Sequence, residues 1–367
     1  MIRSFFGRLR DGALDRAGAA VDRALVHAAL DVARRSPDRE RVAREDHDAR
    51  LAELARVTDA YADPAYLDDP ARFFVTPRPV DPAQSAVRAL PRGTGAVVDL
   101  AWESGFEPVH ALPRDEHLGY RENLTARARV WLHPSPRPAI VCVHGYLGGR
   151  WSIEEPAFSA SWLHGLGLDV AFTLLPFHGE RCPSGRQGMF PGRDPWRTVE
   201  GFAQAVHDLR ALVGWLRARG APSITLFGMS LGAYTSALTA TVCDDVDQVV
   251  MMIPLASLAD AYVEHREGRD DRAPEWLRPR IDEAFRVVSP LARPARVRGD
   301  DALILAAGGD RITRRSHAEN LRAHFDASLE VFPGGHILQA GRGKAFGATA
   351  RFLAGRGVIA GRTSAHT

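Results

Sequence analysis

The sequence predicts an α/β protein whose core is a mostly parallel sheet of eight strands, with helices covering both faces. Two observations predict this class. Short runs made almost entirely of apolar residues, such as AIVCV, ITLF, VVMMI and ALILAA, are typical of strands buried on both faces. Amphipathic segments separate these runs, and strands that alternate with helices indicate βαβ units.

Composition limits the classes of protein that fit. The chain has 367 residues, of which 45% are hydrophobic and 25% charged, as in ordinary globular proteins. A net charge of +2 gives no sign of nucleic-acid binding. The cysteine count of 3 is too small for a disulfide framework, and no apolar run is long enough for a transmembrane helix. We therefore expect a cytoplasmic protein without nucleic-acid partners.

The first part of the chain, residues 1–95, is predicted to be a helical extension. Apolar residues recur at helical spacing before Ser36-Pro37, and a second helix is expected from about Arg39 to Pro64. Four prolines within residues 76–92 indicate an irregular connection.

The start of this extension allows two interpretations. Apolar residues interleaved with arginines would suit a helix at a membrane surface, through residues 1–35. Acidic residues offset that positive charge and favour docking on the main domain or on a second subunit. The oligomeric state is not predicted. The acidic residues are Asp11, Asp15, Asp22 and Asp31.

The main domain is predicted to span residues 96–358, and residues 359–367 form a tail. Its clearest helix is Val199–Arg219, which Gly220 ends. The expected strands are Val97–Glu103, Thr125–Leu132, Ala139–Val143, Asp169–Leu175, Ser223–Phe227, Gln248–Ile253, Ala302–Ala307 and Ser328–Phe332.

The most informative motif is a serine on a predicted sharp turn. The segment SITLFGMSLGAYTSALTA is typical of a strand, a turn and a helix, with Ser230 at the turn in a G-x-S-x-G pattern. Glycines on both sides leave room for neighbouring backbone, and the start of the helix favours negative charge nearby. We predict that Ser230 is a nucleophile; the alternative is an ordinary tight turn.

Residues 139–340 resemble the α/β-hydrolase superfamily in motif type, order and spacing. In that family an acid and then a histidine follow the nucleophile along the chain. Asp310 follows the strand ALILAA, and His336 follows the strand SLEVF, so both fall at the sheet edge that carries Ser230. The resemblance implies the α/β-hydrolase fold and a triad of Ser230, His336 and Asp310.

Alternatives exist for two members of this triad. Asp310 would otherwise cap the helix that is expected near Arg314, and Asp260 is the main rival acid because some members of the family place it there. His336 would otherwise be a packed histidine in a glycine-rich turn. No other late histidine directly follows a predicted strand.

The resemblance also implies an oxyanion hole, two backbone N–H groups that bind the negative oxygen of a tetrahedral intermediate. The segment VHGYLGG follows the strand AIVCV and matches the family's His-Gly loop. The implied donors are Leu231, directly after the nucleophile, and Tyr146, with Leu147 as the alternative to Tyr146. His144 is expected to orient this loop.

The loop Pro176–Arg181 matches another family loop by position and is expected to shape the rim of the site through Phe177 and His178. Glu180 and Arg181 within it are expected to form a local ion pair.

Residues 254–294 interrupt the strand pattern and are predicted to be either a short helical lid or a helical connection packed on the domain. Their apolar face would comprise Trp276, Leu277, Ile281 and Phe285. A pocket for an acyl chain would have these candidate walls: Leu147, Phe177, His178, Met229 and Trp276.

The resemblance implies a serine hydrolase that cleaves a small-molecule or lipid carboxylic ester through an acyl-enzyme, without metal or organic cofactor. Two other classes fit the motifs: an acyltransferase or peptidase with the same triad, and a binding protein of this fold without catalysis.

Overall fold

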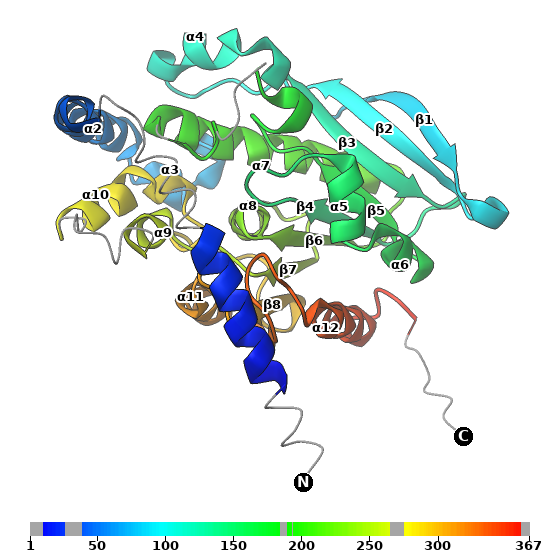
Figure 1. Cartoon of the computed structure of the whole chain (residues 1–367). Helices are drawn as coiled ribbons and strands as arrows, with labels where there is room; N and C mark the ends of the chain where they lie inside the picture. The colour runs from blue at the N-terminus through cyan, green and yellow to red at the C-terminus, as the bar shows by residue number, and fades with distance from the viewer. Residues whose placement is uncertain (1–9, 26–38, 184–188, 193, 265–274, 361–367) are drawn as a thin grey trace.

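The computed structural model describes residues 10–25, 39–183, 189–192, 194–264 and 275–360 (Figure 1). Within these residues the chain forms one nine-stranded sheet with helices on both faces, which is the predicted α/β class. The strands are β1 Ala83–Ala89, β2 Ala96–Glu103, β3 Thr125–Leu132, β4 Ala139–Val143, β5 Asp169–Thr173, β6 Ile224–Met229, β7 Gln248–Met252, β8 Ala302–Ala307 and β9 Ser328–Phe332.

The sheet has the order β1-β2-β3-β5-β4-β6-β7-β8-β9. Six neighbouring strands run parallel, in the order β5-β4-β6-β7-β8-β9. The strands β1, β2 and β3 pair antiparallel with their neighbours. Strand order reverses around β4, since β5 lies on one side of it and β6 on the other. Open parallel sheets bind ligands at the carboxyl ends of strands beside such a reversal.

The eight predicted strands are confirmed, and β1 is an addition that corrects the prediction. This strand occupies part of the segment that the prolines indicated to be irregular, so residues 1–95 are not helical throughout. Its sequence AQSAVRA lies at the edge of the sheet with every residue exposed, which removes the apolar alternation that reveals a strand. Pro82 and Pro91 lie just outside its ends, where strands tolerate proline.

Alternate side chains of the central strands pack into two apolar layers. Val141 of β4 faces the larger layer, and Cys142 faces the other. The larger layer is covered by α7 Pro195–Ala218, α8 Leu231–Thr239 and α11 Arg315–Phe325. The second is covered by α5 Trp151–Ala157, α6 Ala160–Gly165 and α12 Arg342–Gly355. This double burial is the physical reason for the uninterrupted apolar runs.

Shorter elements complete the described chain. The α-helices are α2 Arg39–Tyr61, α3 Ala65–Asp68, α4 Ala111–Gly119, α9 Leu258–Glu264 and α10 Leu277–Ala284. The 3-10 helices are Pro70–Arg72, Pro91–Gly93, Arg121–Leu124, Gly179–Arg181, Arg286–Val288 and Gly299–Asp301. None of the helices in the part of the chain that is described is both long and apolar enough to cross a membrane.

The predicted apolar face of residues 254–294 is largely buried. Leu277 and Ile281 of α10 pack with Ala259 of α9 and with side chains of α2. Figure 1 shows α10 near α2, with α9 next to α10. This packing fits a helical connection docked on the domain; a role as a lid stays a prediction, and residues 265–274 lie outside the described chain.

Residues 10–25 form a helix, here called the N-terminal helix, which lies against the loops that follow β8 and β9 (Figure 1, dark blue). The side chain of Asp15 accepts the N–H of Gly334, at 2.8 Å. Residues 10–25 are therefore docked on the chain's own main domain, at the loops that follow β8 and β9. The apolar and basic residues before residue 10, on which a membrane contact would depend, lie outside the described residues.

Candidate functional site

Ser230 lies on a sharp turn between β6 and α8. Its backbone has φ 55° and ψ −114°, a conformation that residues other than glycine rarely adopt. Its N–H donates to the carbonyl of Met252 at 3.0 Å. The flanking glycines permit this turn. A Cβ on Gly232 would lie 1.9 Å from the carbonyl oxygen of Val143, and one on Gly228 would lie 2.2 Å from that of Gly232. The local sequence thus fixes where the hydroxyl projects.

The structure brings the three predicted site residues together in one chain of hydrogen bonds. His336 Nε2 lies 3.0 Å from Ser230 Oγ, and His336 Nδ1 lies 2.8 Å from Asp310 Oδ2. Both the imidazole and the carboxylate are buried. An imidazole placed between an alcohol and a buried carboxylate has the geometry to take the proton of the alcohol.

Asp310 is held in position by its own loop. Its Oδ1 accepts the N–H groups of Ile312, at 2.9 Å, and Thr313, at 2.8 Å, which leaves Oδ2 facing His336. It does not cap α11, whose N-cap is Arg314. The rival Asp260 instead accepts from Arg278 Nε at 2.7 Å. Of the two carboxylates considered, the structure therefore places Asp310 on the histidine.

Thr313 was not predicted as a site residue. Its hydroxyl donates to the carbonyl of Ile253 at 3.0 Å and lies 3.1 Å from both Asp310 Oδ2 and His336 Nδ1. The signal in the sequence is the spacing in Asp-x-x-Thr, because an aspartate often bonds the backbone two or three residues on.

The His-Gly loop lies directly against the serine. A Cβ on Gly145 would be 3.5 Å from the Cβ of Ser230, so the following residues, Tyr146 and Leu147, lie at the same edge of the sheet. Both side chains are exposed, and Leu147 has a φ of 62°. Leu231 opens α8, and an α-helix leaves the N–H groups of its first turn without partners inside the helix.

His144 holds this loop from behind. Its Nε2 accepts the N–H of Leu175 at 3.1 Å, and its Nδ1 lies 2.8 Å from the carbonyl oxygen of Gly145. Burial lowers the pKa of His144 to about 3, so the ring stays neutral. Glu154 Oε1 accepts the N–H of Gly149 at 2.8 Å and closes the far end of the loop.

The predicted ion pair between Glu180 and Arg181 is wrong. Arg181 turns inward and pairs with Asp208 of α7 at 2.8 Å, while Glu180 pairs with Arg127 at 3.4 Å near the surface. Arg181 also donates to the carbonyl of Leu174 at 2.9 Å. Asp208 is the stronger partner because water does not solvate either charge in the interior, so each buried charge needs the other. Asp208 lies far from Arg181 in the sequence, so spacing along the chain does not predict this pair.

Phe177 does not lie at the rim as predicted. It is 1% exposed, and its ring packs against His117 at 5.5 Å and Tyr120 at 5.3 Å between ring centres, within the domain core. The cause is its backbone, whose positive φ of 57° belongs to a turn that directs the ring inward, away from the exposed edge.

His178 lies beside the His-Gly loop, with its ring centre 6.3 Å from that of Tyr146. Its Nδ1 is 2.9 Å from the carbonyl oxygen of Pro176, and its Nε2 is buried without a hydrogen-bond partner in the described chain. Burial lowers the pKa of His178 to about 4. Of the other predicted pocket residues, Met229 is buried in the second apolar layer and Trp276 is exposed before α10.

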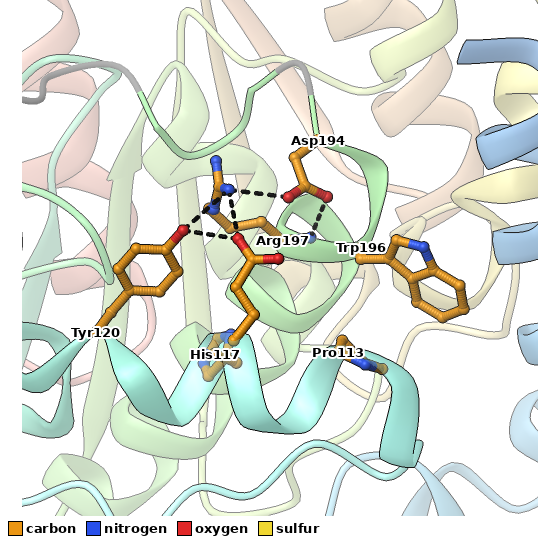
Figure 2. A pocket seen from close by; sticks show the side chains of 7 residues that line it. Pro113, His117, Tyr120, Asp194, Trp196 and Arg197 are labelled. Carbon is orange, nitrogen blue, oxygen red and sulfur yellow. Dashed lines mark hydrogen bonds and ion pairs between the residues drawn. The ribbon is translucent and has the colours of Figure 1, made fainter. Parts of the chain in front are cut away.

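A separate pocket lies between α4 and the start of α7 (Figure 2). Arg197 occupies its centre and pairs with Glu116 at 3.0 Å and with Asp194 at 2.9 Å. The lining residues are Pro113, Glu116, His117, Tyr120, Asp194, Trp196 and Arg197, and they include none of the predicted site residues. Across the described residues no cluster of His, Cys, Asp or Glu is suited to hold a metal ion.

The sheet order, the turn at Ser230 and the helices on both faces define a protein of the α/β-hydrolase fold. Solved structures agree. An acetyl xylan esterase from Paenibacillus sp. R4 is 14% identical, covers 84% of this chain and 94% of its own, and has a TM-score of 0.55. Acetyl xylan esterase 1 from Thermoanaerobacterium sp. JW/SL YS485 is 17% identical, covers 82% and 92%, and has a TM-score of 0.50. At these identities the likeness establishes the fold alone.

The relatives in sequence are mycobacterial. The uncharacterized protein Rv2627c of Mycobacterium tuberculosis (strain ATCC 25618 / H37Rv) is 33% identical over 291 residues, which are 77% of this chain and 70% of that protein. The uncharacterized protein MT2702 of strain CDC 1551 / Oshkosh matches to the same extent. The chain belongs to the family of these two proteins. A comparison with protein-family models finds no match.

Proposed function

We propose that this protein is a serine hydrolase that cleaves carboxylic esters through an acyl-enzyme. The observation that carries the proposal is the chain of hydrogen bonds from Ser230 Oγ through His336 to Asp310. Esterases among the solved structures of the same fold support this class of reaction. A cytoplasmic location stays a prediction.

The proposed first half-reaction forms the acyl-enzyme. His336 Nε2 takes the proton of Ser230 as Oγ bonds to the carbonyl carbon of the ester, and the carbonyl oxygen becomes negative. Asp310 stabilises the imidazolium that forms. When the tetrahedral centre collapses, the carbon–oxygen bond to the alcohol breaks and His336 gives its proton to the departing alcohol.

The proposed second half-reaction returns the free enzyme. A water molecule gives a proton to His336 as its oxygen bonds to the acyl carbon, and Ser230 leaves with that proton as the acid is released. In both halves the N–H groups of Leu231 and Tyr146 would bind the oxyanion, a contribution of about 10²–10³ in rate for each donor. These steps need no metal or organic cofactor.

The groups beside Ser230 favour a substrate that combines an apolar part with one polar group. Tyr146 and Leu147 expose their side chains beside Ser230, and His178 places a buried, neutral ring behind them. An apolar edge with one unpartnered ring nitrogen would suit an ester with one polar group near the scissile bond.

The experiment is labelling with a fluorophosphonate, followed by a panel of acyl esters of increasing chain length. We expect the wild-type chain to be labelled, Ser230→Ala to be unlabelled, and turnover to depend on Ser230. Ser236 on α8 is a matched control, since it is a buried serine outside the turn, and Ser236→Ala should label like the wild type. A wild-type chain without labelling or turnover would favour a binding protein of this fold, and acyl transfer to an added alcohol in preference to water would favour an acyltransferase.

A further inference from the structure

One carboxylate of the N-terminal helix contacts both loops that carry the histidine and the acid of the site. Asp22 is completely buried. Its Oδ2 accepts the backbone N–H of His336 at 2.8 Å and that of Arg311 at 3.0 Å, and its Oδ1 accepts the N–H of Ile337 at 3.0 Å. These donors are His336 itself, the residue after it, and the residue after Asp310.

Such contacts fix the two loops relative to each other. A buried carboxylate is stable only when hydrogen-bond donors surround it, and charge-assisted hydrogen bonds are short and directional. Because Oδ2 is shared between Arg311 and His336, a shift of either loop would stretch one of these bonds. Asp22 therefore limits the relative movement of Asp310 and His336 from outside the sheet.

The backbones also touch at points where only glycine fits. A Cβ on Gly18 would lie 2.1 Å from the nitrogen of Gly335, and a Cβ on Gly309 would lie 2.1 Å from the carbonyl oxygen of Asp15. The N-terminal helix thus contacts the acid loop and the histidine loop backbone to backbone. This approach brings Asp22 within reach of three N–H groups.

We propose that Asp22 is a positioning residue for the triad, which sets the distance and orientation of His336 relative to Asp310 and Ser230. The inference rests on the proposed function and extends it to a part of the chain that precedes the sheet. Asp22 touches no reacting atom, so its effect passes entirely through the two loops.

The test compares full-length variants in ester hydrolysis and in the rate of fluorophosphonate labelling. Asp22→Ala removes both acceptor oxygens and with them all three hydrogen bonds. We expect kcat to fall about 10–100-fold with KM changed by less than about twofold, because displacement of a catalytic group by about 1 Å has effects of this size. Asp22→Asn keeps one carbonyl oxygen and should have a smaller loss. Asp11→Asn is the matched control, because Asp11 lies on the same helix but pairs with exposed Lys344 at 2.7 Å.

A double-variant measurement separates positioning from general damage to the fold. In a His336→Ala chain the residual hydrolysis no longer uses the histidine, so adding Asp22→Asn should change it by less than about twofold. A loss as large as in the wild-type background would overturn the inference. If Asp22→Ala does not fold, as judged by its thermal unfolding, Asp22→Asn decides the test: a folded Asp22→Asn with wild-type kcat and labelling overturns the inference.

Ser230→Ala, measured in parallel, keeps the two proposals apart. Full turnover in Ser230→Ala would refute the proposed function itself. Loss of turnover in Ser230→Ala together with wild-type kinetics in both Asp22 variants would leave the proposed function intact and overturn only the role of Asp22.

Discussion

Arg181 and Asp208 form an ion pair of 2.8 Å in the interior, where the two side chains are 0% and 3% exposed. The pair connects the loop after β5 to the middle of α7. Burial lowers the pKa of Arg181, and the carboxylate of Asp208 opposes that shift and keeps the guanidinium charged. Ser104 also donates to Asp208, at 2.5 Å. The loop beside His178 is therefore held by a charge pair rather than by apolar packing alone.

Asp208→Ala should lower the free energy of unfolding by about 3–5 kcal/mol, since it leaves a buried guanidinium without its partner. Chemical denaturation measures this directly. The control is Glu180→Gln, which removes the partly exposed pair with Arg127 and should change stability by about 0–1 kcal/mol. Equal effects of the two substitutions would mean that the inward pair does not hold the loop.

Asp310→Asn should reduce kcat for an activated ester by about 10⁴-fold, because an amide no longer stabilises the imidazolium and favours the wrong tautomer of His336. Steady-state kinetics with a chromogenic ester gives the value. Asp260→Asn, which alters the contact with Arg278, should retain nearly wild-type kcat. If instead Asp260→Asn has the large effect, the acid of the triad has been wrongly assigned.

Gly232→Ala should destabilise the protein by about 3 kcal/mol or more, because the added methyl group would lie 1.9 Å from the carbonyl oxygen of Val143, a backbone atom that cannot move aside. Gly214→Ala is the matched control. Gly214 is exposed on α7 with nothing near its Cβ position, and alanine there should stabilise by up to about 1 kcal/mol. Thermal unfolding of the two variants should shift in opposite directions, and a wild-type melting temperature for Gly232→Ala would contradict the observed turn.

Glu200→Gln should change how stability depends on pH. Burial raises the pKa of Glu200 from 4.5 to about 7, although a hydrogen bond from Tyr61 opposes the shift. Between about pH 4.5 and 7 the folded chain therefore holds a proton that the unfolded chain has released. The protonation of Glu200 therefore adds about 3 kcal/mol to the free energy of unfolding below pH 4.5, and this stabilisation is lost as pH rises towards about 7.

The measurement is the difference in unfolding free energy between wild type and Glu200→Gln from pH 4 to pH 8. The difference should favour the wild type increasingly towards low pH, because glutamine has no such proton. Glu116→Gln is the control: hydrogen bonding lowers the pKa of Glu116, so the stabilisation it contributes is present above about pH 4.5 and is lost only as pH falls below that value. A pH-independent difference for Glu200→Gln would contradict the raised pKa.

The sequence predicted the fold, and it predicted that Ser230, Asp310 and His336 come together, because the signals involved are local. Ser230 follows the buried strand β6, Asp310 follows the buried strand β8 and His336 follows the edge strand β9, and parallel strands bring their carboxyl ends to one edge. Strand β1 was missed because an exposed edge strand has no core face to impose a pattern. The inward turn of Phe177 was missed because it depends on a backbone conformation that a lone phenylalanine does not reveal.

The contacts that support the site were harder to predict, since they join distant parts of the chain. Arg181 finds Asp208 through burial, and Asp22 reaches His336 across 314 residues. Each aspartate is one of many acidic residues in the sequence, and only the fold singles it out. Sequence reasoning placed Asp22 in the correct helix and considered docking on the domain, but periodicity alone could not say which loops the helix would meet.

The position of the N-terminal helix has a consequence for biosynthesis. Residues 10–25 leave the ribosome long before residues 310–337, which form their docking surface, have been made. The earliest helix of the described chain must therefore wait for the last two strands, and contacts of such long range form slowly. We expect the newly made chain to acquire its sheet first, and the N-terminal helix to dock only after the loops that follow β8 and β9 have been made.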